Sequence, residues 1–203
     1  IRIENGTISL PKVGNVPIRL HWKLPSDFKT VSVSYHHGIW EASIVLKVKR
    51  SPIKEELNNV AGFDINSAHT LVSSKCWYVT NPKSLKKSEA KLKRIQVKLS
   101  RQKKGSNRWN KTKLRLQKIH YDIRNQRLNF GHQVSSTIAK CFDLAVFEDL
   151  NVKAMQQWND RMTGHNIMGE ILSLIRYKMD RTGGMTHNIN RFMASTKICN
   201  NCD

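Results

Sequence analysis

The sequence has few acidic residues, few cysteines and no long apolar run. Its 203 residues hold 15 Asp and Glu against 35 Lys and Arg, a formal net charge of +20. No apolar stretch approaches the roughly 18 residues of a membrane-spanning helix, and the start of the chain lacks the basic and apolar regions of a secretory signal. Four cysteines do not make a disulfide framework, so we expect a cytosolic protein that is neither secreted nor membrane-bound. The hydrophobic fraction of 39% excludes a disordered basic tail.

The excess positive charge is concentrated in one segment. Residues 75–127 hold 18 basic and 2 acidic side chains, which is 16 of the 20 excess charges. Such a segment repels itself unless a polyanion lies against it, and each phosphate that it neutralises releases a counterion. We therefore expect nucleic acid as the partner, and the alternative is a solvated helix face that only aids solubility. A membrane surface is disfavoured because the segment has few large apolar residues to insert.

The first 50 residues are expected to form antiparallel β-structure. Between residues 40 and 48 apolar and polar side chains alternate, which is the period of a strand with one buried face. The sequence His36-His37-Gly38 predicts the turn that leads into this strand. Other strands are expected at 7–10, 16–20 and 31–35. A polar linker is expected at 51–58.

Residues 59–203 are expected to form an α/β domain. Short apolar strands are predicted at 59–65, 70–72, 77–79, 144–147 and 185–192. From Ser84 the apolar residues recur at helical spacing on both sides of a turn at Gly105-Ser106-Asn107, which predicts a basic helical hairpin. A further helix, ending at Gly183-Gly184, is expected to bury one apolar face. That face holds Met168, Ile171, Leu172, Ile175 and Met179.

Nine basic side chains of the hairpin are expected to bind nucleic acid. They are Lys86, Lys87, Lys93, Arg94, Arg101, Lys103, Lys104, Arg108 and Lys111. Because their charge would neutralise phosphates, the sequence predicts salt-sensitive affinity for structured RNA and for RNA–DNA duplexes.

Two of the predicted strands end in a carboxylate, Asp64 and Glu148. In such sheets functional groups collect at the carboxyl ends of parallel strands, and short apolar strands are typical of central strands buried on both faces. If the two strands are neighbours, the carboxylates reach one point, where two hard oxygen ligands suit Mg²⁺ and phosphodiester cleavage. The alternative is that each carboxylate caps a turn or the next helix.

Cys199 and Cys202 form a Cys-x-x-Cys pair. Two cysteines at this spacing are half of a zinc ribbon, whose tetrahedron needs two further ligands. A redox pair is the alternative, although no thioredoxin-like context surrounds it, and His187 is the nearest histidine that could complete a zinc site. Cys76 and Cys141 have apolar neighbours in the sequence and are expected in the core.

Several motifs follow one another in a distinctive order along nearly the whole chain. They are Gly62-Phe63-Asp64-Ile65, Asn81-Pro82-Lys83-Ser84-Leu85-Lys86-Lys87, Phe147-Glu148-Asp149-Leu150-Asn151-Val152, Asn190-Arg191-Phe192, Ser195-Thr196-Lys197 and Cys199-x-x-Cys202. In this order they closely resemble the TnpB family, also called OrfB-type transposases, of bacterial insertion sequences. These proteins are relatives of the type V CRISPR effectors.

The resemblance implies an α/β fold. Residues 59–203 resemble an RNase H-like (RuvC-type) nuclease domain with a mixed sheet, with an inserted helical hairpin at 84–141 and the start of a zinc ribbon at 195–203. Residues 1–50 resemble the last strands of a small antiparallel, wedge-like β-barrel. The implied function is RNA-guided DNA endonuclease activity in a prokaryotic cytoplasm, at the nucleoid, with DNA and a guide RNA as partners.

The resemblance also implies roles for individual residues. Asp64 and Glu148 match the first two catalytic carboxylates that hold Mg²⁺, and Cys199 and Cys202 match the first half of a structural Zn²⁺ site. The third carboxylate is expected beyond the last residue, so we expect a fragment, truncated at both ends, that is inactive alone. Asn66 departs from the family pattern, which usually has glycine there. A nuclease-dead relative that binds RNA and DNA is therefore the alternative, and a basic RNA-binding module without nuclease ancestry is a third reading.

Overall fold

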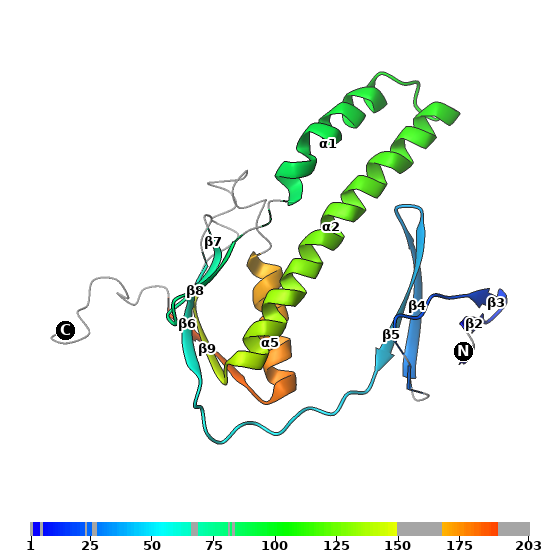
Figure 1. The fold of residues 1–203 in the computed structure, drawn as a ribbon. Helices are drawn as coiled ribbons and strands as arrows, with labels where there is room; N and C mark the ends of the chain where they lie inside the picture. Colours follow the sequence, from blue (N-terminus) through cyan, green and yellow to red (C-terminus); the bar gives the residue numbers. More distant parts are fainter. Residues whose placement is uncertain are drawn as a thin grey trace. The chain divides into compact units, whose positions relative to one another are not determined.

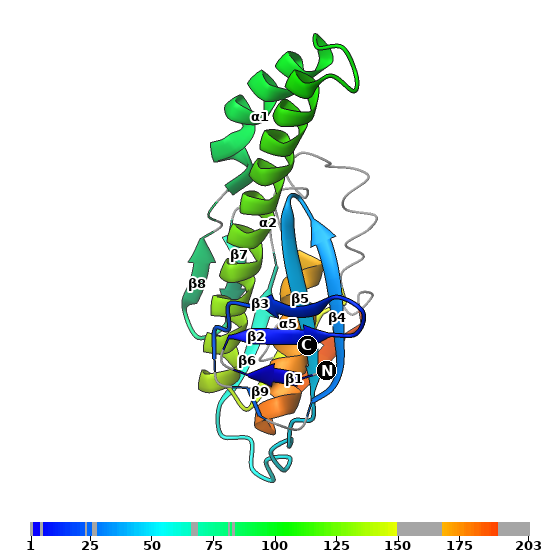
Figure 2. The same cartoon turned by 90° about the vertical axis from the view of Figure 1, so that its right-hand side faces the viewer.

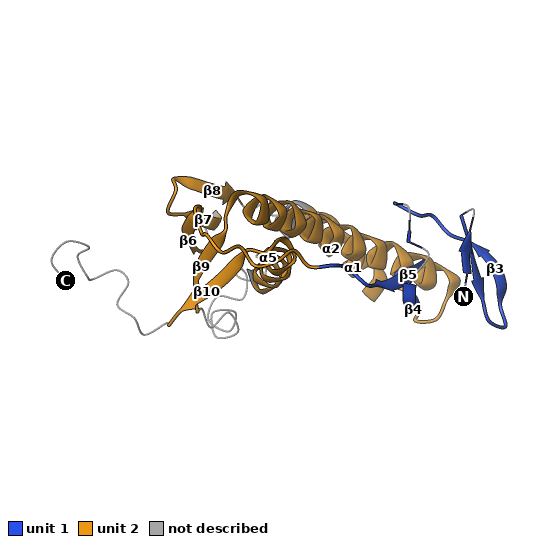
Figure 3. Cartoon of the chain, turned by 90° about the horizontal axis from the view of Figure 1, so that it is seen from below, with its two compact units in different colours: residues 1–49 blue, residues 50–203 orange. Residues whose placement is uncertain are grey.

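The computed structural model describes residues 2–4, 6–22, 24–25, 28–65, 69–80, 82, 84–149 and 168–190. The chain divides into two units, Ile1–Lys49 and Arg50–Asp203, which Figure 3 colours separately. The segment 51–58, expected as a linker, is hydrogen-bonded to the second unit. The N–H of Ser51 donates to the carbonyl of Arg181 (3.2 Å), and the N–H of Lys54 donates to the carbonyl of Gly183 (2.9 Å).

The first unit contains two antiparallel sheets. Strands β1, β2 and β3 form one in that order, and β4 and β5 form a hairpin. The hairpin turn has positive φ at both His37 (57°) and Gly38 (84°), which matches the right-handed twist of the flanking strands. The turn predicted at this place is therefore confirmed. The bounds are β1 Arg2–Glu4, β2 Thr7–Leu10, β3 Gly14–Pro17, β4 Phe28–His36 and β5 Ile39–Leu46.

The second unit is built on a five-stranded mixed sheet with the order β10-β9-β6-β7-β8 (Figure 3). Strands β10, β9 and β6 are parallel, and β7 and β8 continue the sheet antiparallel. This confirms the predicted mixed α/β fold. The bounds are β6 Val60–Asp64, β7 His69–Ser73, β8 Trp77–Thr80, β9 Leu144–Glu148 and β10 Met185–Ile189.

Three helices complete the described part of the second unit: α1 (Ser84–Ser100), α2 (Asn107–Cys141) and α5 (Met168–Thr182). Gly105, with φ of 84°, makes the turn between α1 and α2. The hydroxyl of Ser106 then caps α2 by accepting the N–H of Trp109 at 3.2 Å, which satisfies one of the helix's free amide donors. None of the described helices combines the length and the apolar character needed to cross a membrane.

Helix α2 packs on different partners along its length (Figures 1 and 2). Near its start, Ile119 and Ile123 are buried with Leu92 of α1. Near its end, Val134 and Ile138 belong to the main core with the sheet and α5. The second half of α2 is thus part of the α/β core. Each buried side chain stabilises the fold by about 1.5–3 kcal/mol.

Two expectations about burial are wrong. Cys76 and Cys141 are exposed, because Cys76 lies in the β7–β8 turn with φ of 57° and Cys141 is the last residue of α2. The central strands are also not buried on both faces. Phe63 and Phe147 are at most 4% exposed, on the face that α2 and α5 cover, whereas Val60 on the other face is 39% exposed.

Candidate functional site

Asp64 and Glu148 end two adjacent parallel strands, β6 and β9. The register pairs Val60 with Leu144 and continues to Phe63 with Phe147, so the carboxylates occupy the next, equivalent positions. Neighbouring strands lie about 4.8 Å apart, which places the two backbones side by side at one edge of the sheet. The structure therefore has the adjacency on which a shared metal site depends.

The two carboxylates also lie on the same face of the sheet. Side chains alternate along a strand, and Phe63 and Phe147 face the helices, so Asp64 and Glu148 point to the opposite face. Asp64 is exposed and Glu148 is half-buried. Of the described helices, those that pack on the sheet, α2 and α5, lie on the other face and do not cover them.

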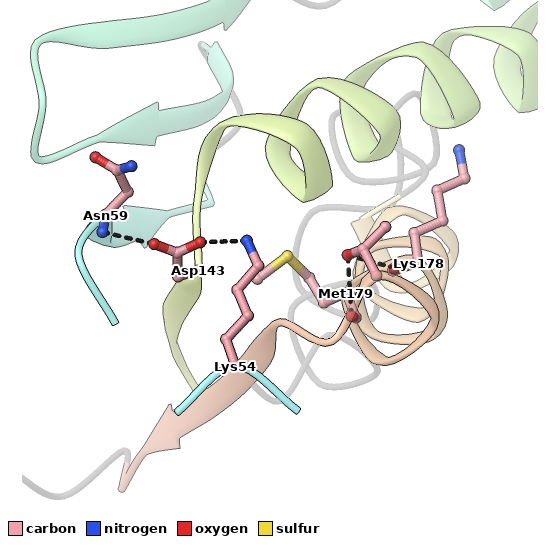
Figure 4. A network of polar contacts seen from close by, with 6 residues as sticks. Lys54, Asn59, Asp143, Lys178 and Met179 are labelled. Carbon is pink, nitrogen blue, oxygen red and sulfur yellow. Dashed lines mark hydrogen bonds and ion pairs between the residues drawn. The ribbon is translucent and has the colours of Figure 1, made fainter. Parts of the chain in front are cut away.

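Asp143 fixes the register at the other end of these strands (Figure 4). Its Oδ2 accepts the N–H of Asn59 at 2.9 Å, and its Oδ1 is paired with the ammonium of Lys54. Its backbone N–H donates to the Asn59 carbonyl at 2.8 Å, and its own carbonyl accepts the N–H of Met185 at 2.8 Å. One residue thus joins the starts of β6, β9 and β10.

The same contacts hold Asp143 in its ionised form. The hydrogen bond from Lys54 and then the N–H of Asn59 lower the pKa of Asp143, and they outweigh the opposing effect of burial. Because hydrogen bonds to the charged form favour ionisation, the carboxylate is negative at neutral pH. Since β6 and β9 start in register here, they end in register at Asp64 and Glu148.

Lys178 joins α5 to α2 on the helical side of the sheet. Its ammonium donates to the carbonyl of His132 at 2.7 Å and to the hydroxyls of Ser135 at 2.8 Å and Ser136 at 2.7 Å. Burial lowers the pKa of Lys178, and it also lowers the pKa of His132, with the Lys178 charge adding to that effect. This cluster holds the two core helices together and lies on the side of the sheet away from the carboxylates.

The basic side chains of the hairpin that were predicted to bind nucleic acid are exposed in the part that the structure describes. Of the nine basic residues, the side chain of Lys87 lies outside the described part, and the other eight are exposed. Neither of the two ion pairs found among the described residues involves the hairpin. The ammonium of Lys113 lies 5.0 Å from the centre of the Trp109 ring, so a flat aromatic surface accompanies the charge. The positive charge of the hairpin is thus available to a polyanion.

The remaining metal predictions lie largely outside what the structure describes. Cys199, Cys202 and Asn66 are outside the described residues. His187 is exposed on β10, at the edge of the sheet. In the described ranges no group of three or more His, Cys, Asp or Glu side chains could hold a metal ion.

The contacts of Asp143 with Lys54 and Asn59 are not apparent from the sequence. Lys54 and Asp143 are separated by 89 positions, and no local pattern connects them. One feature of the sequence could have pointed to them: Asp143 and Asn59 each directly precede a strand that ends in a carboxylate.

Comparison with known proteins gives a consistent result. A family model described as "Probable transposase" (OrfB_IS605) matches residues 43–159, more than half of the chain. The chain is 32% identical over 154 residues to "Putative RNA-guided DNA endonuclease InsQ" of Escherichia coli strain K12, an alignment that covers 76% of this chain and 38% of that protein. It is 27% identical over 206 residues to "Putative RNA-guided DNA endonuclease" of Streptomyces pristinaespiralis, covering 98% and 51%. The chain spans about half or less of the length of these relatives.

Proposed function

Because the chain belongs to the OrfB (TnpB) family of transposases, we propose that it is part of an RNA-guided DNA endonuclease and carries two of that enzyme's catalytic carboxylates. The family match over 43–159 includes Asp64, Glu148 and the whole basic hairpin. The observation that carries the proposal is the position of Asp64 and Glu148 at the ends of adjacent parallel strands.

The fold proposed for the second unit is RNase H-like, of the RuvC type. Three observations support it: a mixed sheet, carboxylates on its two inner parallel strands β6 and β9, and helices packed on one face. The other face, which carries the carboxylates, is left for the substrate. The two β-sheets of the first unit correspond in this proposal to the end of a wedge-like domain.

The carboxylate pair fits a magnesium ion by the chemistry of its donors. Mg²⁺ prefers oxygen ligands and is usually held by one or two carboxylates together with substrate phosphates. Asp64 and Glu148 supply two such side chains on one open face. Bound there, the ion would activate water and stabilise the leaving oxygen of a phosphodiester. The chain's own contribution is to hold both carboxylates in register, which the Asp143 contacts at the opposite strand ends secure.

Nucleic acid is proposed to lie along the hairpin of α1 and α2. Its exposed basic side chains carry charge that no described ion pair neutralises, and contacts to phosphates do not depend on base sequence. In RNA-guided cleavage the base pairing of the guide selects the target, while the protein holds the duplex by its shape and backbone. A basic surface that contacts phosphates and does not recognise base sequence is suited to this role of the protein.

The test is a chimera in which this chain replaces its aligned segment in the E. coli relative. With Mg²⁺ and guide RNA, the chimera is expected to cut target DNA. Asp64→Ala or Glu148→Ala should abolish cleavage and leave target binding largely intact, whereas Glu56→Ala, at an exposed acid outside the hairpin, should change neither. The 203-residue chain alone is expected not to cut.

Two results would contradict the proposal. Cleavage that survives Asp64→Ala or Glu148→Ala would remove that residue from the mechanism. A chimera with both carboxylates intact that binds its target and never cuts would favour the alternative, a nuclease-dead protein that only binds guided DNA. The departure from the family pattern at Asn66 is the sequence feature that favours this alternative.

A further inference from the structure

A cavity of about 320 Å³ lies beside α2 where it faces the first turn of α5. Its floor is Ile123, which is 5% exposed. Four ionisable side chains form the rest of its lining: His120, Arg124, Arg127 and Glu170. Three of these are exposed and Arg127 is half-buried, so the cavity opens to solvent.

The cavity lies at the place where α2 changes partners. Ile123 is the last residue of α2 that is buried with α1, and Phe130 is the first that packs on the α/β core. His120, Arg124 and Arg127 are spaced by four and three positions, so they project from the same side of the helix. The interval between the two helix contacts therefore presents three basic side chains together.

Arg127 has a donor without an acceptor. Its Nε is buried and makes no hydrogen bond within the described part of the chain. A buried donor that lacks a partner is unfavourable, and more so when it carries charge. Glu170 is the one carboxylate in the lining, and no ion pair between it and either arginine is found among the described residues. The cavity thus has net positive charge, and Arg127, one of its lining residues, has an unsatisfied N–H.

We propose that this cavity binds a backbone phosphate of a nucleic acid, with Arg124 and Arg127 as its ligands and His120 at its rim. The inference rests on the proposed function and adds a specific contact to it. The guanidinium fork matches the oxygens of phosphate, which can accept two N–H groups of one arginine together. RNA and DNA share this chemistry.

The position of the cavity continues the basic surface towards the sheet. From Lys111, the last of the nine predicted residues, to Arg127 is 16 positions, or about 24 Å along a helix. A strand with one phosphate per roughly 3.4 Å would cover that distance in about seven steps. A duplex held at the hairpin could therefore reach the cavity on its way to the core of the unit.

The first test measures the salt dependence of binding for the full 203-residue chain. Labelled single-stranded RNA, duplex DNA and an RNA–DNA duplex serve as separate probes, because they distinguish the source of the phosphate. Arg124→Gln and Arg127→Gln should each weaken binding of at least one probe and reduce the slope of log affinity against log salt by about one. Arg127→Lys, which keeps the charge and loses the guanidinium fork, should weaken binding of that probe by less. Lys118→Gln, on roughly the opposite side of α2, is the matched control and should have a smaller effect.

The second test uses a substitution that should strengthen nucleic-acid binding. Glu170→Gln removes the carboxylate that competes with phosphate for the arginines, so it should strengthen binding. Asp122→Asn removes the same charge from roughly the opposite side of α2 and should strengthen binding less. If only the total charge of the chain mattered, the two substitutions would strengthen binding equally.

The outcomes separate this inference from the proposed function. Salt-dependent binding in which the Arg124 and Arg127 variants match Lys118→Gln, or Glu170→Gln matches Asp122→Asn, would overturn the phosphate site and leave the proposed function standing. Absence of measurable affinity for all three probes would overturn both. Arg124 is exposed, so its variant folds independently of any structural role of Arg127.

Discussion

Asp143 shows how one side chain far from the candidate site can set its geometry. Asp143 itself precedes β9, and its carboxylate and backbone bind Lys54, Asn59, which precedes β6, and Met185, which starts β10. The folded state lowers the pKa of Asp143, so its stabilising contribution is present above the ordinary carboxyl pKa. That contribution is lost as the pH falls through the lowered value, because the unfolded state then binds the proton first.

We expect Asp143→Asn to lower the melting temperature at neutral pH. The difference from the unmodified chain should shrink as the pH is taken down through the acid range, since protonation removes the same contacts. Thermal melts at a series of pH values measure this. Asp180→Asn is the control, because Asp180 pairs with Arg50 at the exposed surface and should contribute little. A loss that is constant with pH would show that the charge of Asp143 is not responsible.

Among the secondary-structure elements, the end of α5 depends on a glycine. Gly183 has φ of 77°, and a Cβ there would lie 2.1 Å from the carbonyl oxygen of Pro52. Because Gly183 has no side chain, the 51–58 segment can lie directly against it, and the backbone N–H of Lys54 donates to the Gly183 carbonyl. Glycine is needed here both for the backbone conformation and for the space.

Gly183→Ala is therefore expected to destabilise the second unit. The left-handed backbone alone costs a non-glycine residue about 1–2 kcal/mol, and displacement of the 51–58 segment adds to this. Gly105→Ala is the matched control, because Gly105 has φ of 84° with no atom within 4 Å of the added Cβ. Denaturant unfolding should show a larger loss for Gly183→Ala than for Gly105→Ala. Equal losses would mean that the segment around Pro52 yields without cost.

The hairpin should bind through its exposed tip. Replacing Lys103, Lys104 and Arg108 with Ala is expected to lower both the affinity for RNA–DNA duplexes and the salt slope, by about 0.7–0.9 for each phosphate that the variant no longer neutralises. The control is the triple change of Lys49, Arg176 and Arg181 to Ala, which removes equal charge from exposed positions outside the hairpin. A salt slope unchanged by the first triple variant would exclude the tip as the binding surface.

The sequence predicts these elements well where their signals are local. The periodicity from Ser84 and the turn at Gly105 predict α1 and α2, and β9 begins where its apolar run begins. Burial was predicted less well, because the face that a helix covers depends on residues far away in the chain. Cys76 shows this, since its apolar neighbours flank a turn that exposes it.

The candidate site, too, could be predicted from the sequence only where its signals are local. The carboxylates at the strand ends are visible in the sequence at Asp64 and Glu148, and their role stays a prediction. Their pairing depends on contacts between residues such as Lys54 and Asp143, which no local pattern reveals. The Arg127 cavity was missed for the same reason, because Glu170 approaches it only in the folded unit.

For the whole molecule, zinc content is a separate prediction. Cys199 and Cys202 provide two thiolates, and a structural zinc site uses four protein ligands. We expect weak or no stoichiometric zinc in the purified 203-residue chain, because water would have to complete the tetrahedron. Elemental analysis after dialysis measures this. One tightly held zinc ion per chain would contradict the prediction and make His187 a candidate ligand.

The order of strands in the sheet has a consequence for how the chain is synthesised. Phe63 of β6 pairs with Phe147 of β9, 84 positions later, whereas α1 and α2 are joined by a short turn. At about 5–20 residues per second, translation leaves β6 without its parallel partner for roughly 4 to 17 s. During that interval the helices, whose contacts are local, can already pair.

We therefore expect the basic hairpin to form on the ribosome before the carboxylates meet. Arrested nascent chains of increasing length, probed with protease, should show protection of 84–123, the part in which α1 and α2 pack on each other, before protection of 60–64. Simultaneous protection of both segments would contradict this order. If this folding order holds, a growing chain acquires its affinity for nucleic acid while the residues proposed to cut are still apart. It can then bind RNA during synthesis without cutting DNA.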